Sequence, residues 1–502
     1  MSKRTVTRRA GRAHLITHHL SLIALVAALA ATSVGCGARR TPNLGRIFAG
    51  ARERRGKRPV IVIPGILGSR IVNRRTGEVV WPSVFRSDVD GLSLPATPDL
   101  AANRDELAAA RIVDAAKLAG KFGPEVYVYH HLIRALEEFG GYREGEWENP
   151  PEGGDRDTFY VFAYDWRRDN VESARLLVKR VEALKLRLGR PDLRFNVVAH
   201  SMGGLVARYA AMYGDRDLPE AGAEPRPDWA GAAFVSKIFM FGTPNGGSME
   251  ALSVLLEGYS VTEGLRRRVH LLNKLSREDV LTAPSIFQLL PHRAQARFLD
   301  RDLRPLALDL YDPDTWRRYG WTAVHDPAFR ADYARGVARG QEAPTGHGTL
   351  AELDAYFVAV LERARRFHEA LDASDGAAAE APVRLFAFGG DCEETLAAPV
   401  VLADEKSGRW LTLTRPKTFR GADGRRHARA EVVRAMYAPG DGRVTRDSLM
   451  GLGLVVGRGS AFYETPLPVA YAAFACDLHS ELQNNKNLQD NALTLLVNEL
   501  MS

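Results

Sequence analysis

The feature that most constrains this 502-residue chain is a short apolar run at residues 195–199 that leads directly into a serine and a glycine-rich helix start. Ser201 lies between Ala199 and Gly203, and an apolar-periodic stretch follows over residues 203–212. A buried strand that turns abruptly into a helix leaves no room for large side chains two positions before or after the turning residue. Ala199 and Gly203 meet that requirement, so the sequence predicts a sharp strand-to-helix turn with Ser201 at its apex.

Other short apolar runs have the length and composition of strands that are buried on both faces of a sheet. Amphipathic stretches separate them, as at residues 126–139 and 173–188, and this alternation favours a parallel sheet with right-handed crossovers. We therefore expect an α/β fold with a mostly parallel, doubly wound sheet. Besides 195–199, the expected strands are 58–65, 158–164, 236–242, 383–389 and 471–476, and a terminal helix is expected over 488–501.

Two segments interrupt this alternation within residues 58–502, which we take as one domain. Residues 246–380 contain many leucine, arginine and aromatic residues but no comparable apolar run, so we expect a mainly helical cap insertion. Residues 398–437 are expected to form a β-excursion, because two apolar runs flank the turn-like sequence Lys-Ser-Gly at 406–408.

A serine at such a turn has the surroundings that a nucleophile needs. The helix that starts after Ser201 directs its first amides toward developing negative charge, and the Met202 amide is one candidate donor for an oxyanion. The loop after the first expected strand can supply a second donor, for which the Ile66 amide is our candidate. The alternatives are a glycine-rich turn with an incidental serine and, for the loop around Ile66, a simple Pro-Gly turn.

An acid and a histidine are expected to follow the nucleophile along the chain, in the order that α/β-hydrolases use. Asp441 lies in a glycine-rich turn after an apolar run, and His479 follows the last expected strand. From there the imidazole can take the proton of Ser201, while the carboxylate orients the ring and stabilises its charged form. The competing candidates are Asp391, Asp447, Asp477, His427 and His200. For His200, beside the serine, we favour a packed and hydrogen-bonded role.

Residues 1–36 are typical of a secretory signal peptide. A basic stretch precedes an apolar run at 20–31, and the sequence Ser-Val-Gly-Cys at 33–36 is similar to a bacterial lipobox, whose cysteine is lipidated after cleavage. The alternative to lipidation of Cys36 is an uncleaved membrane anchor. In both cases the protein is expected in the cell envelope, and residues 37–57 are expected to be a basic linker because they lack apolar periodicity.

The net charge of +7 comes from the amino-terminal end of the chain. Residues 1–58 contain 13 of the 68 basic residues and one of the 61 acidic ones, so the remaining body carries a charge of −5. A basic tether on a mildly acidic body argues against nucleic acid as a partner. It favours a membrane surface, where each Lys or Arg near anionic headgroups contributes about 1 kcal/mol.

Apart from Cys36, the sequence has two cysteines, Cys392 and Cys476. In an oxidising compartment they can form one disulfide, and the alternative is a pair of small buried thiols. The sequence has no nucleotide-binding loop, metal-spaced His/Cys cluster or haem motif. We therefore expect neither a cofactor nor a metal.

Five runs of the sequence, in this order, resemble the family of lecithin:cholesterol acyltransferase and phospholipid:diacylglycerol acyltransferase. The Tyr-Asp-Trp-Arg run at 164–167, together with the Gly-Asp turn at 440–441, is the more specific part of this resemblance. The runs are 59–68, 164–167, 200–204, 242–248 and 440–444. The resemblance spans most of residues 58–490.

The resemblance implies a two-step reaction in which Ser201 takes an acyl chain from an ester lipid and passes it to an alcohol acceptor or to water. It implies Ser201, Asp441 and His479 as the triad and Ile66 and Met202 as oxyanion donors. A cap that excludes water would favour a lipid alcohol, such as a sterol or diacylglycerol, as the acceptor. A plain lipase or carboxylesterase would use the same residues. A non-catalytic lipid-binding lipoprotein is the alternative of another class.

Two further groups of residues are expected to have structural roles. For Asp165 and Arg167, which follow a buried strand, we favour bracing of a loop near the site over catalysis. Five apolar cap residues are expected to form the core of the cap, and the alternative is a wall that contacts an acyl chain. These residues are Phe287, Leu289, Leu290, Trp316 and Trp321.

Overall fold

The computed structural model describes most of the chain from residue 41 onward, and the segment that we expect to be a signal peptide, with Cys36, lies outside the described residues. The described ranges are 41–82, 91–113, 115–117, 125–260, 274–338, 349–373, 382–404, 408–457, 460–464, 467–498 and 500–501. None of the helices in these ranges is both long enough and apolar enough to cross a membrane.

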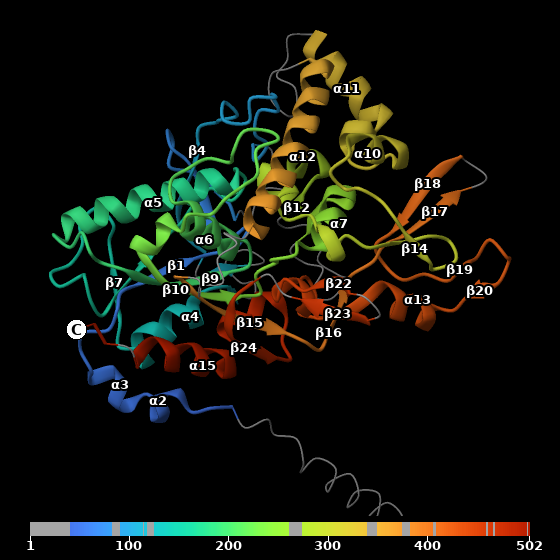
Figure 1. Cartoon of the computed structure of the whole chain (residues 1–502). Helices are drawn as coiled ribbons and strands as arrows, with labels where there is room; N and C mark the ends of the chain where they lie inside the picture. Colours follow the sequence, from blue (N-terminus) through green and yellow to red (C-terminus); the bar gives the residue numbers. More distant parts are fainter. Residues whose placement is uncertain are drawn as a thin grey trace, which may run out of the picture. The chain divides into compact units, whose positions relative to one another are not determined.

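Within the described residues, seven strands form a central sheet in which all neighbours run parallel (Figure 1). In spatial order they are β24 (Val469–Ala475), β15 (Arg384–Gly390), β10 (Val235–Phe241), β9 (Phe195–His200), β1 (Val60–Ile63), β8 (Thr158–Val161) and β7 (Arg143–Gly145). The strand β9, which leads to Ser201, lies in the middle of the sheet. Because the carboxyl ends of parallel strands meet at one edge, the loops that follow them gather there.

The inner strands are buried on both faces, since successive side chains of a strand point to opposite sides. In β1, Ile61 and Ile63 join the hydrophobic core on one face, Val60 and Val62 join the core on the other, and all four are at most 1% exposed. Helices cover both faces (Figure 1). They are α5 (Asn170–Arg187) and α6 (Met202–Tyr213) on the first face, and α4 (His130–Arg134) and α15 (Lys486–Val497) on the second.

This architecture confirms the predicted fold class, because the sheet is parallel, covered on both faces, and carries Ser201 at the end of its central strand. All six expected strands are present, and β7 was not expected because Arg143 and Glu144 are charged and exposed. The stretch 126–139 differs from the expected helix: it starts in strand β6 (Glu125–Tyr127) and continues as α4 and the π-helical turn η1 (Ala135–Phe139).

The segment between β10 and β15 is rich in helices that pack around an aromatic core. The Trp316 ring lies 6.4 Å from that of Phe287 and 5.4 Å from that of Trp321, and all three side chains are at most 2% exposed. Leu289 and Leu290 are buried as well. These residues therefore form the core of the cap and do not offer a free wall to an acyl chain. The described helices are α7 (Met249–Glu257), α8 (Arg277–Leu281), α9 (Pro284–Phe287), α10 (Pro313–Tyr319), α11 (Pro327–Ala338) and α12 (Leu350–Asp372).

The segment expected to be a β-excursion contains a hairpin of β17 (Val400–Asp404) and β18 (Arg409–Leu413), and residues 405–407 of its turn lie outside the described residues. It ends in a helix that was not expected, α13 (Arg429–Met436). The hairpin joins cap strand β13 (Phe298–Leu299), which also pairs with β14 (Pro305–Leu306). Other elements are β11 (Tyr259–Ser260), β12 (Lys274–Leu275), β16 (Glu393–Leu396), β19 (Phe419–Arg420), β20 (Arg426–His427), β21 (Tyr437–Gly440), α14 (Arg446–Leu449), β22 (Gly453–Gly457) and β23 (Ser460–Glu464).

The amino-terminal part of the body differs from the expected linker over 37–57. It contains two short helices, α2 (Leu44–Ile47) and α3 (Ala49–Glu53), which pack against η1. Leu44, Phe48 and Ala51 are at most 4% exposed, because their spacing of four and three residues places them on one helical face. After β1, the chain forms a small antiparallel sheet of β3 (Val79–Trp81), β2 (Ser69–Asn73) and β4 (Leu107–Ile112), followed by β5 (Ala115–Lys117), which pairs with β6.

Candidate active site

Ser201 stands at the apex of the turn between β9 and α6, with backbone angles of φ 52° and ψ −127°. A non-glycine residue with positive φ is strained and persists only where its surroundings hold it. Here the Ser201 amide donates to the Phe241 carbonyl at 2.7 Å, and the Gly204 amide donates to the Ser201 carbonyl at 3.0 Å. A Cβ at Gly203 would lie 2.5 Å from the Pro64 carbonyl oxygen, so this packing requires glycine. The turn has the geometry that the sequence predicted.

Two further side chains form a hydrogen-bonded row with Ser201. His479, which follows β24, places its Nε2 2.9 Å from the Ser201 Oγ, and its Nδ1 lies 2.8 Å from an oxygen of Asp441, which follows β21. A carboxylate only accepts hydrogen bonds, so Nδ1–H donates to Asp441 and the unprotonated Nε2 accepts from the Ser201 hydroxyl. The structure thus brings together the three residues proposed from the sequence, in the order that proton transfer from the serine requires. Their catalytic role stays a prediction.

The Asp441 carboxylate is 2% exposed and is held by backbone amides as well as by His479. Its second oxygen accepts from the Arg443 amide at 2.9 Å and from the Val444 amide at 2.7 Å. Burial by itself raises the pKa of Asp441, but the His479 charge and hydrogen bond and the two amides outweigh it, so the pKa lies below its usual range. Asp441 therefore stays ionised at neutral pH and can stabilise a protonated His479.

The two candidate oxyanion donors are free to bind a ligand. Within the described ranges, neither the Ile66 amide nor the Met202 amide has a hydrogen-bond partner. Met202 is the first residue of α6, where amides have no partner inside the helix. The turn that carries Ile66 lies against the serine, because a Cβ at Gly65 would be only 2.7 Å from the Ser201 Cβ. Their role as oxyanion donors stays a prediction that this arrangement favours.

The turn around Ile66 is fixed by side chains from two other segments. The Trp81 indole nitrogen donates to the Leu67 carbonyl at 2.9 Å, and the Tyr164 hydroxyl donates to the Pro64 carbonyl at 3.0 Å. Tyr164 opens the 164–167 run that carries much of the family resemblance. Through Tyr164, the run therefore holds in place the turn that carries the candidate oxyanion donor Ile66.

Arg167 anchors the other end of that run. Its guanidinium is 1% exposed and binds the carboxylates of Asp165 and Asp105 at 2.6–3.0 Å, and it also donates to the Leu92 carbonyl at 3.0 Å. None of the described hydrogen bonds of Arg167 reaches the triad. This geometry favours the bracing role expected for Asp165 and Arg167 over a catalytic one.

A buried chain of hydrogen bonds joins the turn around Ile66 to the candidate base. The Gly65 amide donates to the Tyr129 hydroxyl oxygen at 2.8 Å, this hydroxyl lies 2.9 Å from the His200 Nδ1, and the His200 Nε2 lies 3.0 Å from the His479 carbonyl oxygen. A carbonyl only accepts, so the His200 Nε2 carries the proton and its Nδ1 accepts from the Tyr129 hydroxyl. All three bonds therefore run in one direction, from the turn to the loop of His479.

His200 keeps this pattern because it does not become protonated in the folded protein at ordinary pH. Burial, reinforced by the charge of His479, lowers the pKa of His200 to about 3. The neutral ring holds one tautomer, which is the one that fits the hydrogen-bond chain. His200 thus has the packed and hydrogen-bonded role that the sequence favoured.

The other candidates from the sequence lie outside the triad. In the part of the chain that the structure describes, none of Asp391, Asp447, Asp477 and His427 hydrogen-bonds to Ser201 or His479. Cys392 and Cys476 form a disulfide with a Cα–Cα distance of 5.2 Å. It links the ends of β15 and β24, so it ties the strand before His479 to its neighbour.

Two residues of the site were missed in the sequence. Tyr129 belongs to no motif, and its partners Gly65 and His200 are 64 and 71 residues away, so no local signal could have identified it. Gly242 has a φ of 58°, and a Cβ there would lie 3.0 Å from the His479 ring. A signal for Gly242 existed, since it opens the 242–248 run of the family resemblance.

We predict that Tyr129→Phe lowers kcat for an ester about tenfold and changes KM less than about twofold. The change leaves the Gly65 amide and the His200 Nδ1 unpaired in a buried place, at a cost of about 1–3 kcal/mol. Steady-state kinetics on p-nitrophenyl acetate measures the effect. Tyr160→Phe is the matched control, because the Tyr160 hydroxyl is also buried but donates to the Gly154 carbonyl, at 2.9 Å. An unchanged kcat in Tyr129→Phe would show that the hydrogen bonds through Tyr129 and His200 do not position the candidate catalytic groups.

We also predict that His200→Gln weakens the pH dependence of stability on the acid side. In the unfolded chain a histidine has a pKa of about 6.5, whereas burial lowers the pKa of His200 to about 3 in the folded protein. The wild type therefore has its full stability above about pH 6.5 and loses part of it as the pH falls toward 3. The variant lacks this titration, so its thermal midpoint should fall less between about pH 7 and about pH 4. Scanning fluorimetry measures the thermal midpoints. If the midpoint fell by the same amount in wild type and variant, a neutral buried His200 would be contradicted.

Comparison with solved structures gives matches over much of the chain at low identity. The crystal structure of the Tle4–Tli4 complex covers 88% of this chain and 98% of that chain, at 15% identity and a TM-score of 0.49. The lipase BlEst2 of Bacillus licheniformis in its propeptide form covers 89% and 54%, at 9% identity and a TM-score of 0.32. EstA from Clostridium botulinum covers 89% of both chains, at 13% identity and a TM-score of 0.30. These scores lie below 0.5, so the fold assignment rests on the sheet and on the turn at Ser201.

Comparison of sequences bears on the family. Residues 93–303, which include Ser201 and the 164–167 run, match the model of the family Lecithin:cholesterol acyltransferase. A curated relative, Lecithin-cholesterol acyltransferase-like 4 of Arabidopsis thaliana, is 25% identical over 256 residues. That alignment covers 46% of this chain and 42% of the relative, so the match spans less than half of the relative's length. The resemblance seen in the motifs is thereby confirmed: over residues 93–303 the chain is similar to the lecithin:cholesterol acyltransferase family, and its fold is that of an α/β-hydrolase.

Proposed function

We propose that this chain is a serine-dependent lipid acyltransferase or phospholipase, which moves an acyl chain from an ester lipid to an alcohol acceptor or to water. The observation that carries the proposal is the alignment of Ser201, His479 and Asp441, with hydrogen bonds of 2.9 and 2.8 Å. The match to the lecithin:cholesterol acyltransferase family supports a lipid acyl ester as the substrate class.

In the first step, the Ser201 Oγ attacks the carbonyl carbon of the ester while the His479 Nε2 takes the hydroxyl proton. The carbonyl oxygen becomes an oxyanion, which the Ile66 and Met202 amides stabilise. The ionised Asp441 stabilises the imidazolium. When the tetrahedral intermediate collapses, the bond to the leaving alcohol breaks, and that alcohol receives the proton from His479. The acyl chain is left as an ester on Ser201.

In the second step, an alcohol or a water molecule attacks the acyl carbon and gives its proton to His479. Ser201 leaves and recovers that proton. The same groups therefore serve an acyltransferase, a phospholipase and a plain lipase or carboxylesterase, and only the acceptor that reaches the acyl-enzyme differs. In the alternative of a non-catalytic lipid-binding lipoprotein, Ser201 would not react at all.

We predict that Ser201→Ala abolishes ester cleavage and acyl transfer while the fold is kept, because single losses in such triads reach about 10⁶ in kcat. Wild type and variant are incubated with mixed phospholipids and either diacylglycerol or sterol, and the products are identified by mass spectrometry. Turnover of the variant within about tenfold of wild type would contradict the role of Ser201.

The same experiment separates the alternatives. Formation of triacylglycerol from the added diacylglycerol, or of a sterol ester from the added sterol, identifies a transferase. Formation of free fatty acid alone identifies a hydrolase. A fluorophosphonate probe should label wild type and not Ser201→Ala. If wild type neither reacts with the probe nor turns over any ester, the non-catalytic alternative holds.

We further propose that the body is held in the cell envelope by a lipid on Cys36, close to the membrane that contains its substrates. The apolar run at 20–31 and the lipobox-like sequence at 33–36 support this location. We predict that Cys36→Ser loses fatty-acid labelling in cells and leaves the membrane fraction. Label that persists in the variant, or a mature protein that keeps residues 1–35 by mass spectrometry, would reject lipidation.

A further inference from the structure

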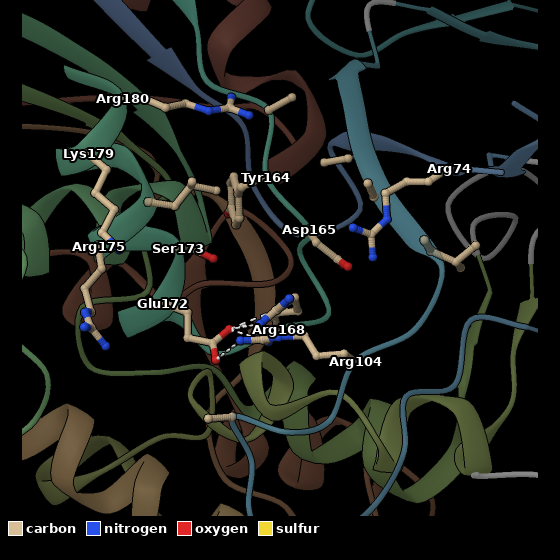
Figure 2. A pocket seen from close by; sticks show the side chains of 16 residues that line it. Arg74, Arg104, Tyr164, Asp165, Arg168, Glu172, Ser173, Arg175, Lys179 and Arg180 are labelled. Atoms are coloured by element: carbon tan, nitrogen blue, oxygen red, sulfur yellow. Dashed lines mark hydrogen bonds and ion pairs between the residues drawn. The ribbon is translucent and has the colours of Figure 1, made fainter. Parts of the chain in front are cut away.

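A cavity of 460 Å³ lies between α5 and β4, beside the 164–167 run (Figure 2). Its volume is in the range of small-molecule sites. None of the three triad residues is among the described residues that line it. Tyr164 and Asp165 lie between its two sides, with α5 on one side and Arg74 on the other. The cavity is therefore distinct from the candidate active site, although both involve the same run.

The described lining of this cavity has an excess of positive charge. Its acidic residues are Asp165 and Glu172. Its basic residues are Arg74, Arg104, Arg168, Arg175, Lys179 and Arg180. A concave surface lined mainly by one sign of charge raises the local concentration of ions of the opposite sign. The lining therefore favours an anion.

Internal ion pairs already use the two acidic groups. Glu172 accepts two hydrogen bonds from Arg104, both at 3.0 Å, and one from the Arg168 Nε at 2.9 Å. Asp165 is bound by Arg167, as described above. Two basic groups thus share the charge of Glu172, and a net positive charge remains at this end of the cavity.

Two cations of α5 are available for a ligand. In the described part of the chain, Lys179 has no ion-pair or hydrogen-bond partner, and it is exposed. The Arg180 guanidinium lies over the Phe162 ring, 5.5 Å from its centre, and no carboxylate is paired with it among the described residues. An aromatic face orients a guanidinium without neutralising it, so both groups keep their charge for an anion.

The cavity also has an apolar part. Leu107, Ala108 and Ala109 of β4 and Ala163 line it, together with Leu176, which is 40% exposed. A simple anion would leave this surface in contact with water. A molecule with an anionic head and an apolar body matches both parts of the lining.

We propose that this cavity binds the phosphate-bearing headgroup of an anionic phospholipid. Guanidinium and ammonium groups are the natural partners of phosphate oxygens, so Lys179 and Arg180 bind the phosphate, and Leu176 with its apolar neighbours contacts the glycerol and the first acyl carbons. A zwitterionic choline headgroup binds less well, because its cation is repelled by the lining. The Tyr164 ring lines the cavity and its hydroxyl holds the Pro64 carbonyl, so the bound lipid lies next to the support of the turn at Ile66.

Calorimetric titration of the full chain carrying Ser201→Ala tests the proposal, since this background leaves the probe intact. The probe is dihexanoyl-phosphatidylglycerol below its micelle concentration, compared with dihexanoyl-phosphatidylcholine and inorganic phosphate. We expect dihexanoyl-phosphatidylglycerol to bind more tightly than the other two probes. Lys179→Gln with Arg180→Gln should weaken its binding about tenfold or more, as expected for the loss of charge-assisted hydrogen bonds.

Arg187→Gln with Arg434→Gln is the matched control. It removes the same charge from two exposed positions that do not line the cavity, and should change binding less than about twofold. Lys179→Gln alone, at an exposed side chain, keeps the test valid if the double variant unfolds. Equal loss in the control pair, or equal binding of the choline lipid, would overturn the proposal. If inorganic phosphate bound as tightly as the lipid, the proposal of a lipid ligand would be overturned in favour of free phosphate. None of these outcomes depends on the reaction at Ser201.

Discussion

The candidate active site depends on one strained turn, in which Ser201 has a φ of 52°. Such a conformation costs on the order of 1–3 kcal/mol and persists only when packing on both sides offsets it. Here all six residues of β9 and all twelve residues of α6 are buried, so the strand and the helix that flank the turn have a single position. Ser201 cannot relax without breaking its hydrogen bond to Phe241 of β10, so the buried centre of the sheet fixes the serine.

The same turn requires backbone segments to approach one another closely, which explains the glycines around it. A Cβ would meet another atom at 2.7 Å or less at Gly65, Gly203 and Gly204, and at 2.9 Å at Gly242. This close packing lets one buried hydrogen-bond chain, through Tyr129 and His200, connect the turn of the candidate oxyanion donors with the loop of His479. Donors held in place before the substrate arrives need no reorganisation during the reaction, which is where catalytic stabilisation by amides originates.

Predictions from the sequence agree with the structure where the packing of the folded protein leaves a recognisable pattern in neighbouring residues. Six central strands could be predicted because burial on both faces produces continuous apolar runs, whereas β7 has three residues, two of them charged and exposed. Ser201 could be identified because its turn excludes large neighbours. The contacts of Tyr129 could not be predicted, because its partners are distant in the sequence. The docking of α2 and α3 could not be predicted either, because these two helices are short and have few apolar residues. The cap aromatics were open to two interpretations until burial decided between them.

In the proposed reaction, the triad does not determine the choice between water and an alcohol acceptor, because His479 would activate both in the same way. Trp316, Trp321 and Phe287 are buried and hold the cap together, so they do not supply the contacts that would select a lipid. The two segments that the hydrogen-bond chain connects each carry a partly exposed apolar residue, namely Ile66 in one and Leu478, 47% exposed, in the other. The same hydrogen-bond chain holds the turn of Ile66 and the backbone of His479, so a substitution that shifts one of these segments should also shift the other.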